Sequence, residues 1–191
     1  MASLDLSSAR ERILLTAHDL FYQHGIRATG IDRVIADARV TKVTFYRHFP
    51  SKNDLVLAFL AHRHDAWMAW FTEALTRHSG GQTRRLVALV PTLREWFSSE
   101  LFRGCAFINA TAELGATLPE AVAVVRRHKA DMTAAIAALL PPGRGRRADA
   151  EAVALAVDGA IVRAQVDGCP EGALRALERL LRRSGVTPDA A

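Results

Sequence analysis

The sequence has few of the features that mark secreted, membrane or disulfide-rich proteins. It contains only two cysteines, Cys105 and Cys169, which fit neither a disulfide framework nor a zinc site. No uninterrupted apolar run reaches the ~18 residues that a membrane helix needs. The N-terminus also lacks the basic start and apolar run of a signal peptide. We therefore expect a cytoplasmic protein that does not enter the membrane.

Motifs of the common enzyme classes are missing as well. The sequence has no Gly-rich phosphate loop and no nucleophile elbow, and its seven histidines show no spacing typical of a metal site. These patterns give no support to an enzyme that would use Cys105 with His128 or Glu113. We expect no catalytic residue, no metal and no cofactor.

What remains is the composition of an ordinary globular chain with a basic balance. Of the 191 residues, 50% are hydrophobic and 24% charged, with a formal net charge of +5 and a pI of ≈ 9.9. This length can bury one core or two small ones. The positive charge suits an anionic partner.

Apolar residues recur at helical spacing throughout the chain, and no alternating β-branched run or internal repeat interrupts them. The pattern predicts an all-α fold. Gly25 should end the first helix and Pro91 should kink or start another. The expected helices cover about residues 9–24, 31–38, 42–48, 53–77, 86–100, 101–114 following Gly104, 119–140, 148–166 and 171–183.

The segment 29–55 organises the rest of the chain. It predicts two short helices joined by a tight turn, the first capped by Thr29 or Gly30 and the second, Lys42–His48, capped by Thr41. Pro50 must stop the second helix. A new helix then begins at Ser51, with an acidic residue three positions later in a pattern close to a capping box. Two helices this short need support from elsewhere and present one face outward.

The outward face of the second helix has the chemistry to read DNA. We expect Lys42 and Thr44 to reach base edges in the major groove, and Tyr46 and His48 to hold phosphates, which set position but not sequence preference. Phe45 and its neighbour Phe49 are expected in the core. The candidate DNA contacts are Thr29, Arg33, Thr41, Lys42, Val43, Thr44, Tyr46, Arg47, His48 and Lys52.

This stretch resembles the helix-turn-helix of TetR/AcrR-type transcriptional regulators. The run T-K-V-T-F-Y-R-H-F-P-S-K-x-x-L from Thr41 carries the resemblance, together with Val34 and Ala38. Arg39 departs from the family's usual turn glycine, and Val43 from its usual glycine or alanine. The resemblance is sharp over about residues 10–60. It implies a three-helix DNA-binding domain over 1–56 and a helical ligand-binding and dimerisation domain over 57–191, with about nine helices in all.

The last two expected helices carry apolar stripes that predict a homodimer. Two such helices that meet their copies across a two-fold axis would form a four-helix interface. A palindromic operator also requires two DNA-binding domains. Packing inside one chain is the alternative role for the stripes. Their residues are Val153, Val157, Ala160, Ile161 and Ala164, and then Leu174, Leu177, Leu180 and Leu181.

Aromatic residues concentrate between positions 67 and 107, with Asn109 and Glu113 one helical turn apart shortly afterwards. Ligand pockets are mostly apolar with a few placed polar groups, so this region is the expected effector site, although ordinary core packing is the better explanation for any single residue. The candidate ligand contacts are Trp67, Phe71, Trp96, Phe102, Cys105, Phe107, Asn109 and Glu113.

These expectations combine into one function. We expect a transcriptional repressor that binds double-stranded DNA at a palindromic operator as a dimer and is released by a small, mostly hydrophobic effector. The long helix over 53–77 joins the expected pocket to the expected DNA-binding helices. A constitutive or architectural DNA-binding dimer without a ligand is the alternative.

Overall fold

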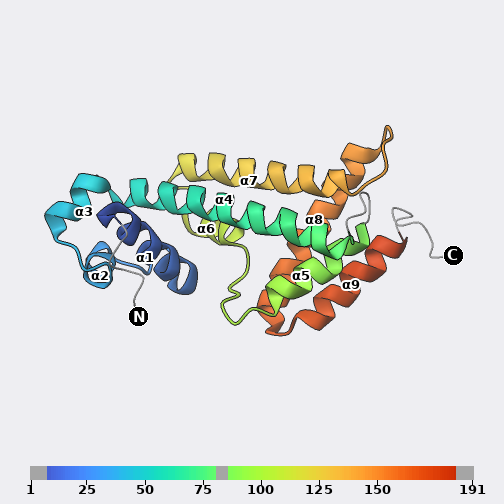
Figure 1. Ribbon diagram of the computed structural model, residues 1–191, viewed down its shortest axis with the longest axis horizontal. Helices are drawn as coiled ribbons and strands as arrows, with labels where there is room; N and C mark the ends of the chain where they lie inside the picture. The colour runs from blue at the N-terminus through green and yellow to red at the C-terminus, as the bar shows by residue number, and fades with distance from the viewer. Residues whose placement is uncertain (1–7, 81–85, 184–191) are drawn as a thin grey trace. The chain divides into compact units, whose positions relative to one another are not determined.

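The computed structural model describes residues 8–80 and 86–183, and within these ranges the chain is helical and has no strand (Figure 1). The all-α prediction is confirmed. The elements are α1 (Ala9–His24), α2 (Ile31–Asp37), α3 (Lys42–His48), α4 (Lys52–His78), a 3-10 turn η1 (Leu86–Ala88), α5 (Leu89–Phe97), α6 (Ala106–Leu114), α7 (Pro119–Ala138), α8 (Arg146–Asp167) and α9 (Pro170–Arg183).

Local capping explains why the first helices begin and end where the sequence predicts. The Ser8 hydroxyl accepts from the Glu11 N–H at 3.2 Å, which satisfies one of the unpaired donors of the α1 terminus. Gly25 ends α1 with a φ of 89° and donates to the Phe21 carbonyl. Ser51 accepts from the Asp54 N–H at 3.1 Å and donates to its carboxylate at 2.7 Å, which caps the start of α4.

Two regions differ from the predicted helices. The helix expected from residue 101 begins only at Ala106, because Gly104 turns the chain with a φ of 78° that no right-handed helix adopts. Of the two outcomes expected at Pro91, the helix start is confirmed, and the helix expected over 86–100 is shorter. Pro91 is the third residue of α5 and follows the 3-10 turn η1, where the missing N–H of proline would have had no helical acceptor.

The chain divides into two compact units. Unit 1 consists of residues 1–65 and 106–126, and unit 2 of residues 66–105 and 127–191. The division falls inside α4, further along the chain than the domain boundary predicted at residue 56, and unit 1 also takes in α6. Thus segments on both sides of the predicted boundary contribute to the unit that contains α3.

The core of unit 2 corrects the predicted dimer stripes. Every residue of the two stripes except Leu180 is buried within the unit, where α8 packs along α9. Leu174 and Val157 are fully buried and Leu177 is 3% exposed. These side chains hold the two helices together inside one chain, so they cannot also face a second copy.

No helix in the described ranges combines the length and the apolar composition required to cross a membrane.

Candidate DNA-binding interface

The turn between α2 and α3 is tight and is closed by backbone hydrogen bonds. The Val40 N–H donates to the Ile35 carbonyl at 3.2 Å, and Arg39 between the helices has a φ of 53°. Thr41 then starts α3, its hydroxyl accepting from the Thr44 N–H at 3.1 Å. The chain therefore forms a helix-turn-helix in which a non-glycine residue occupies the left-handed turn position.

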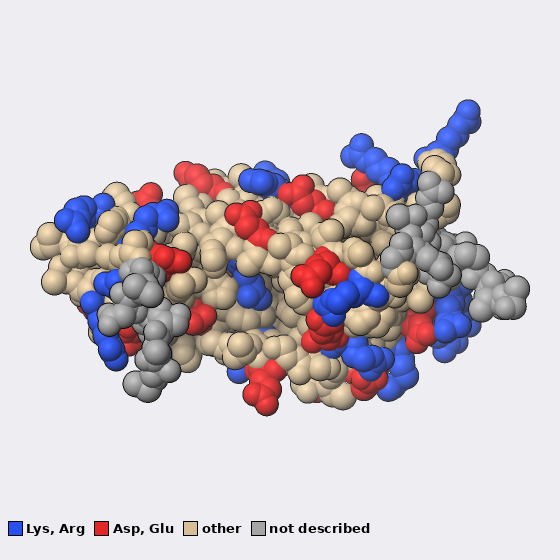
Figure 2. Space-filling model, in the orientation of Figure 1, with Lys and Arg blue, Asp and Glu red and all other residues tan. Residues whose placement is uncertain are grey.

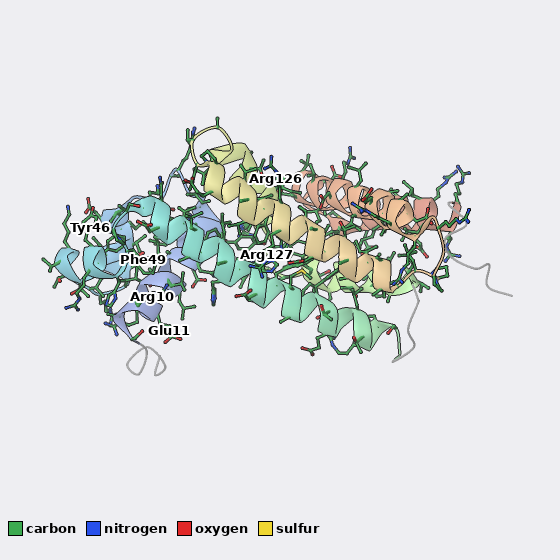
Figure 3. The ribbon with its side chains drawn as sticks, turned by 90° about the horizontal axis from the view of Figure 1, so that it is seen from above. Arg10, Glu11, Tyr46, Phe49, Arg126 and Arg127 are labelled. Atoms are coloured by element: carbon green, nitrogen blue, oxygen red, sulfur yellow. The ribbon has the colours of Figure 1, made fainter. Side chains whose placement is uncertain are left out.

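Aromatic packing in unit 1 fixes the orientation of α3. Phe45 is fully buried and Phe49 is 2% exposed, as predicted, and their ring centroids lie 6.3 Å apart. Arg10 of α1 places its guanidinium 5.2 Å from the centre of the Phe49 ring (Figure 3). This contact of α1 with α3 supplies the support that the short helices lack and leaves the opposite face of α3 exposed.

The exposed face of α3 carries the residues predicted to read DNA. Val43 is 78% exposed and the Lys42 side chain 67%, while Tyr46 is 40% exposed and packs edge-on against Phe45. Figure 2 shows Lys and Arg side chains over this part of unit 1. A lysine can donate to guanine O6 and N7, and an apolar side chain such as valine can contact a thymine methyl.

Other predicted contacts lie at the end of α3, in α2 and at the start of α4. Arg47 is exposed and His48 half-buried, and Arg33 at the start of α2 lies 3.7 Å from Asp37 in an exposed ion pair. Burial lowers the pKa of Lys52, an effect that the nearby Glu113 carboxylate opposes. Arginine, lysine and histidine side chains are among those that can hold the phosphates of a bound duplex.

Thr29 differs from its predicted role. It is fully buried, and its hydroxyl donates to the Gly25 carbonyl at 2.8 Å. The side chain therefore fastens the α1–α2 connection and has no hydroxyl available for a phosphate.

Two positioning contacts were not predicted from the sequence. Asp32 of α2 lies 3.7 Å from the Lys42 ammonium. Glu113 of α6 accepts from the Arg27 N–H at 2.7 Å, and its two oxygens lie 3.4 Å from where a side chain would begin on Gly25. Residues 27 and 113 are 86 positions apart, a separation that gives no signal in a single sequence. The contact occupies the Glu113 carboxylate, which the sequence had assigned to a ligand, within unit 1.

The predicted effector residues fall in both units. Unit 1 holds Phe107, Asn109 and Glu113, and unit 2 holds the other five. In unit 2 the Trp67 ring stacks on Phe71 with centroids 4.5 Å apart and meets the edge of Trp96 at 5.3 Å. The Trp96 ring lies 5.4 Å from that of Phe102, so four of the predicted aromatic residues form one connected cluster.

Two buried polar atoms in unit 2 have no hydrogen-bond partner among the described residues. They are Trp67 Nε1 and Thr92 Oγ1. Thr92 lies one helical turn before Trp96 on α5, and Trp96 contacts the ring of Trp67 on α4, so Thr92 lies on the same side of α5 as this ring contact. Buried groups of this kind are rare, since leaving them unpaired costs free energy.

Cys105, the remaining predicted ligand contact, is buried in unit 2. The Lys129 ammonium lies 3.6 Å from its sulfur and 2.6 Å from Asp158, which is the stronger partner. Across the described ranges, no three metal-ligating side chains come together.

Comparison with known proteins agrees with the helix-turn-helix. Residues 13–59 match the family "Bacterial regulatory proteins, tetR family". Among curated relatives, the repressor NemR of Escherichia coli K12 is 29% identical over 106 residues, which cover 55% of this chain and 53% of NemR. The activator FasR of Mycolicibacterium smegmatis is 35% identical over 81 residues, 42% of this chain and 36% of FasR. The chain thus matches about half or less of these two relatives.

Solved structures extend the similarity over almost the whole chain. A TetR-family transcriptional regulator from Streptomyces coelicolor is 34% identical with a TM-score of 0.79, over 93% of this chain and 90% of that one. The reduced form of Escherichia coli NemR, at 20% identity and a TM-score of 0.75 over 90% and 96% of the two chains, shares the fold. The helix-turn-helix with its exposed reading face, the family match over it and the full-length similarity lead to one conclusion: the chain belongs to the TetR family of DNA-binding transcriptional regulators, which are not enzymes.

Proposed function

We propose that the chain is a dimeric repressor that reads an operator through α3 and is released by an apolar effector. The exposed face of α3, with Lys42, Val43 and Tyr46 held outward by the buried Phe45, carries the proposal. NemR is a repressor and FasR an activator, so repression as opposed to activation needs its own test. Transcription from a promoter that overlaps the selected operator provides it. Because the partner is chromosomal DNA, the proposed site of action is the cytoplasm.

The roles proposed within α3 can be separated by two substitutions. Lys42→Ala should change the preferred base at one position of each half-site, with a discrimination of about 1–3 kcal/mol, because a base-edge donor is lost. Tyr46→Phe should weaken binding to all duplexes alike, because a phosphate contact carries no base information. Selection from randomised duplexes, followed by affinity measurements at fixed salt, measures both effects.

The matched control is Arg175→Ala, which removes one exposed positive charge from α9 in unit 2. It should leave both the operator and the affinity unchanged. If the wild type and Lys42→Ala select the same operator with the same discrimination, Lys42 does not contact a base edge.

The proposed dimer uses a face of α8 other than the one first expected. Leu155, Val162 and Val166 are 76%, 41% and 74% exposed, and their spacings of seven and four residues place them along one side of the helix. Gly159 lies in the same row, and a side chain there would meet nothing within 4 Å. An exposed apolar row with a gap for close approach is suited to a copy of itself across a two-fold axis.

The proposed effector contacts the aromatic cluster of Trp67, Phe71, Trp96 and Phe102 in unit 2. An apolar molecule suits these rings, and a ligand oxygen could accept the hydrogen bond that Trp67 Nε1 makes to no described group. Of the other residues expected to contact an effector, Cys105 lies in unit 2 with the cluster, and Phe107 and Asn109 lie in unit 1. Glu113 is proposed instead to secure the α1–α2 connection, since its carboxylate already accepts from Arg27.

A matched pair of compounds tests the ligand oxygen. By calorimetry, 2-acetylnaphthalene should bind more tightly than 2-ethylnaphthalene by roughly fivefold to tenfold, the value of one hydrogen bond to an otherwise unpaired donor. Trp67→Phe keeps an aromatic ring but removes the donor, so the two affinities should converge. Equal affinities for the wild type would contradict the donor role of Trp67.

Operator release separates a regulator that responds to ligand from a constitutive one. An effector must favour the state that does not bind DNA, since a compound that binds both states equally shifts nothing. Compounds that bind the aromatic cluster with the same affinity in the presence and absence of operator would favour the constitutive DNA-binding dimer.

A further inference from the structure

A groove in unit 2 lies apart from the aromatic cluster and from α3. It has a volume of ≈ 570 Å³, within the range of small-molecule sites. It runs between α7, the loop that follows α7, and the first turns of α8. The lining residues are Lys129, Ala130, Thr133, Ala134, Ala137, Gly143, Arg144, Arg146, Arg147, Ala150 and Glu151.

The floor of this α7–α8 groove is an apolar strip of four alanines, and charged side chains border it. Ala130, Ala134 and Ala137 follow one side of α7, and Ala150 of α8 faces them. The stretch from Lys129 to Ala137 is nine residues of helix, about 12 Å from first to last at the usual rise per residue. The alanine lining thus forms a narrow apolar track that fits an unbranched or flat apolar group.

The charges of the groove are not evenly distributed. At one end the Lys129 ammonium is neutralised by Asp158 at 2.6 Å. On the α8 side the Arg147 guanidinium pairs with Glu151 at 3.0 Å. The unneutralised positive charge therefore lies with Arg144 and Arg146, at the end of the groove formed by the loop, where Figure 2 shows blue side chains at the upper right.

The two arginines without an acidic partner differ in role. Arg146 donates through Nε to the Ala137 carbonyl at 2.7 Å and so helps to hold the end of α7. Arg144 makes no polar contact with any described residue and is exposed. Beside it begins α8, whose N-cap Gly145 offers no side-chain oxygen to its first turn. The first turn of α8 also carries Asp149, whose carboxylate lies 3.3 Å from where a side chain would begin on Gly145. The positive charge that favours an anion here is therefore that of the two arginines.

We propose that the α7–α8 groove binds an amphipathic small molecule with one anionic head group and an apolar tail, of the class of medium-chain carboxylates. The carboxylate pairs with Arg144 and Arg146, and the tail lies along Ala130, Ala134 and Ala137. Charge complementarity fixes the direction in which the molecule lies, since the opposite end of the groove is neutral. This site depends on neither the DNA-reading nor the effector proposal.

Calorimetry of the full chain with decanoate, below its micelle concentration, tests the site. We expect saturable binding of one decanoate per chain, and binding of decanol or inorganic phosphate weaker by about tenfold or more, because each lacks one of the two interactions. Decyltrimethylammonium, which has the same tail and the opposite charge, should not compete with decanoate.

Two variants locate the binding. Arg144→Gln should weaken decanoate binding by about tenfold, the usual value of a charge-assisted hydrogen bond. Ala134→Leu fills the track at an exposed helix position and should weaken it at least as much. The control is Ala123→Leu, an exposed alanine on the same side of α7, about three turns before Ala134 and outside the groove.

Circular dichroism melting should show that all three variants remain folded, as expected at exposed positions. Decanoate that fails to saturate the wild type would overturn the proposal. So would binding that Arg144→Gln and Ala134→Leu both leave unchanged, because the acid would then occupy another place in the chain.

Discussion

Arg39 shows how one residue can adopt a backbone conformation for which it is poorly suited. Its φ of 53° lies in the left-handed region, where a side chain costs roughly 1–2 kcal/mol relative to glycine. The turn nevertheless closes, because the Arg39 N–H donates to the Ala36 carbonyl at 3.1 Å and the Val40 N–H to Ile35. The surrounding helices therefore hold the turn against this local preference.

Replacing this residue should stabilise the protein. Arg39→Gly relieves the left-handed strain but adds freedom to the unfolded chain, so the free energy of unfolding should rise by roughly 0.5–1 kcal/mol. Thermal unfolding measures the change. Arg47→Gly is the matched control: it makes the same substitution inside α3, at a helical position, where it should destabilise by about 1 kcal/mol. Equal losses in both variants would show that Arg39 carries no strain.

At the scale of elements, the end of α4 is tied to α5 by one carboxylate. Glu95 accepts from both terminal nitrogens of Arg77, at 3.2 and 3.1 Å, from His78 at 3.0 Å and from Trp70 Nε1 at 3.3 Å. The hydrogen bonds from Arg77, followed by the one from His78, lower the pKa of Glu95 to about 2. The charged carboxylate is the form that holds this contact.

The pH dependence of stability follows from the sign of this shift. A pKa lowered by folding contributes stability above the unfolded value of about 4.5, and that contribution is lost as the pH falls from there through about 2. Glu95→Gln should therefore lower the melting temperature at pH 7, and its difference from the wild type should shrink below pH 4.5.

A surface ion pair provides the comparison. Glu178 accepts from Arg182 at 2.7 Å one turn along α9, and exposed pairs of this kind contribute little. Glu178→Gln should leave the melting temperature nearly unchanged at pH 7. If Glu95→Gln behaves in the same way, or if its effect persists undiminished at pH 2, the carboxylate does not tie α4 to α5.

At the scale of the whole molecule, the proposed dimer determines whether two reading helices can act together. Leu155→Arg places a charge in the exposed apolar row of α8, where a dimer would bury it without a partner, at a cost of several kcal/mol. The variant should remain folded, become monomeric in light scattering and lose affinity for a palindromic operator. Its affinity for a single half-site should change little.

Leu101→Arg controls for the loss of exposed apolar surface. Leu101 is 67% exposed and lies outside α8 and α9, so its substitution should leave the dimer intact. Dimers of normal stability with Leu155→Arg would exclude this row as the interface. Leu177→Arg could not serve as this test, because Leu177 lies in the core of unit 2 and the fold itself would fail.

Much of the reading domain could be predicted because its signals lie within a few residues of one another. The bounds of α3 are those predicted, Lys42–His48, since Thr41 starts the helix and Pro50 prevents its continuation. The apolar spacing likewise indicated that Phe45 and Phe49 would be buried. The sequence did not predict the late start of α6, because the apolar spacing continues through Gly104, where the backbone turns away from a helix.

The sequence by itself determined the helical class, the caps of the short helices and which side chains α3 presents outward. These features depend on residues three or four positions apart, which lie on the same side of a helix whatever packs around it. Only the tertiary structure decided which apolar row of α8 is buried. Val157 and Leu155 lie on the same helix, and the packing of α9 covers one and leaves the other exposed. The burial of Thr29 and the contact of Glu113 with Arg27 have the same origin. The Glu113 contact joins residues 86 positions apart, and the burial of Thr29 is likewise fixed only when the core packs.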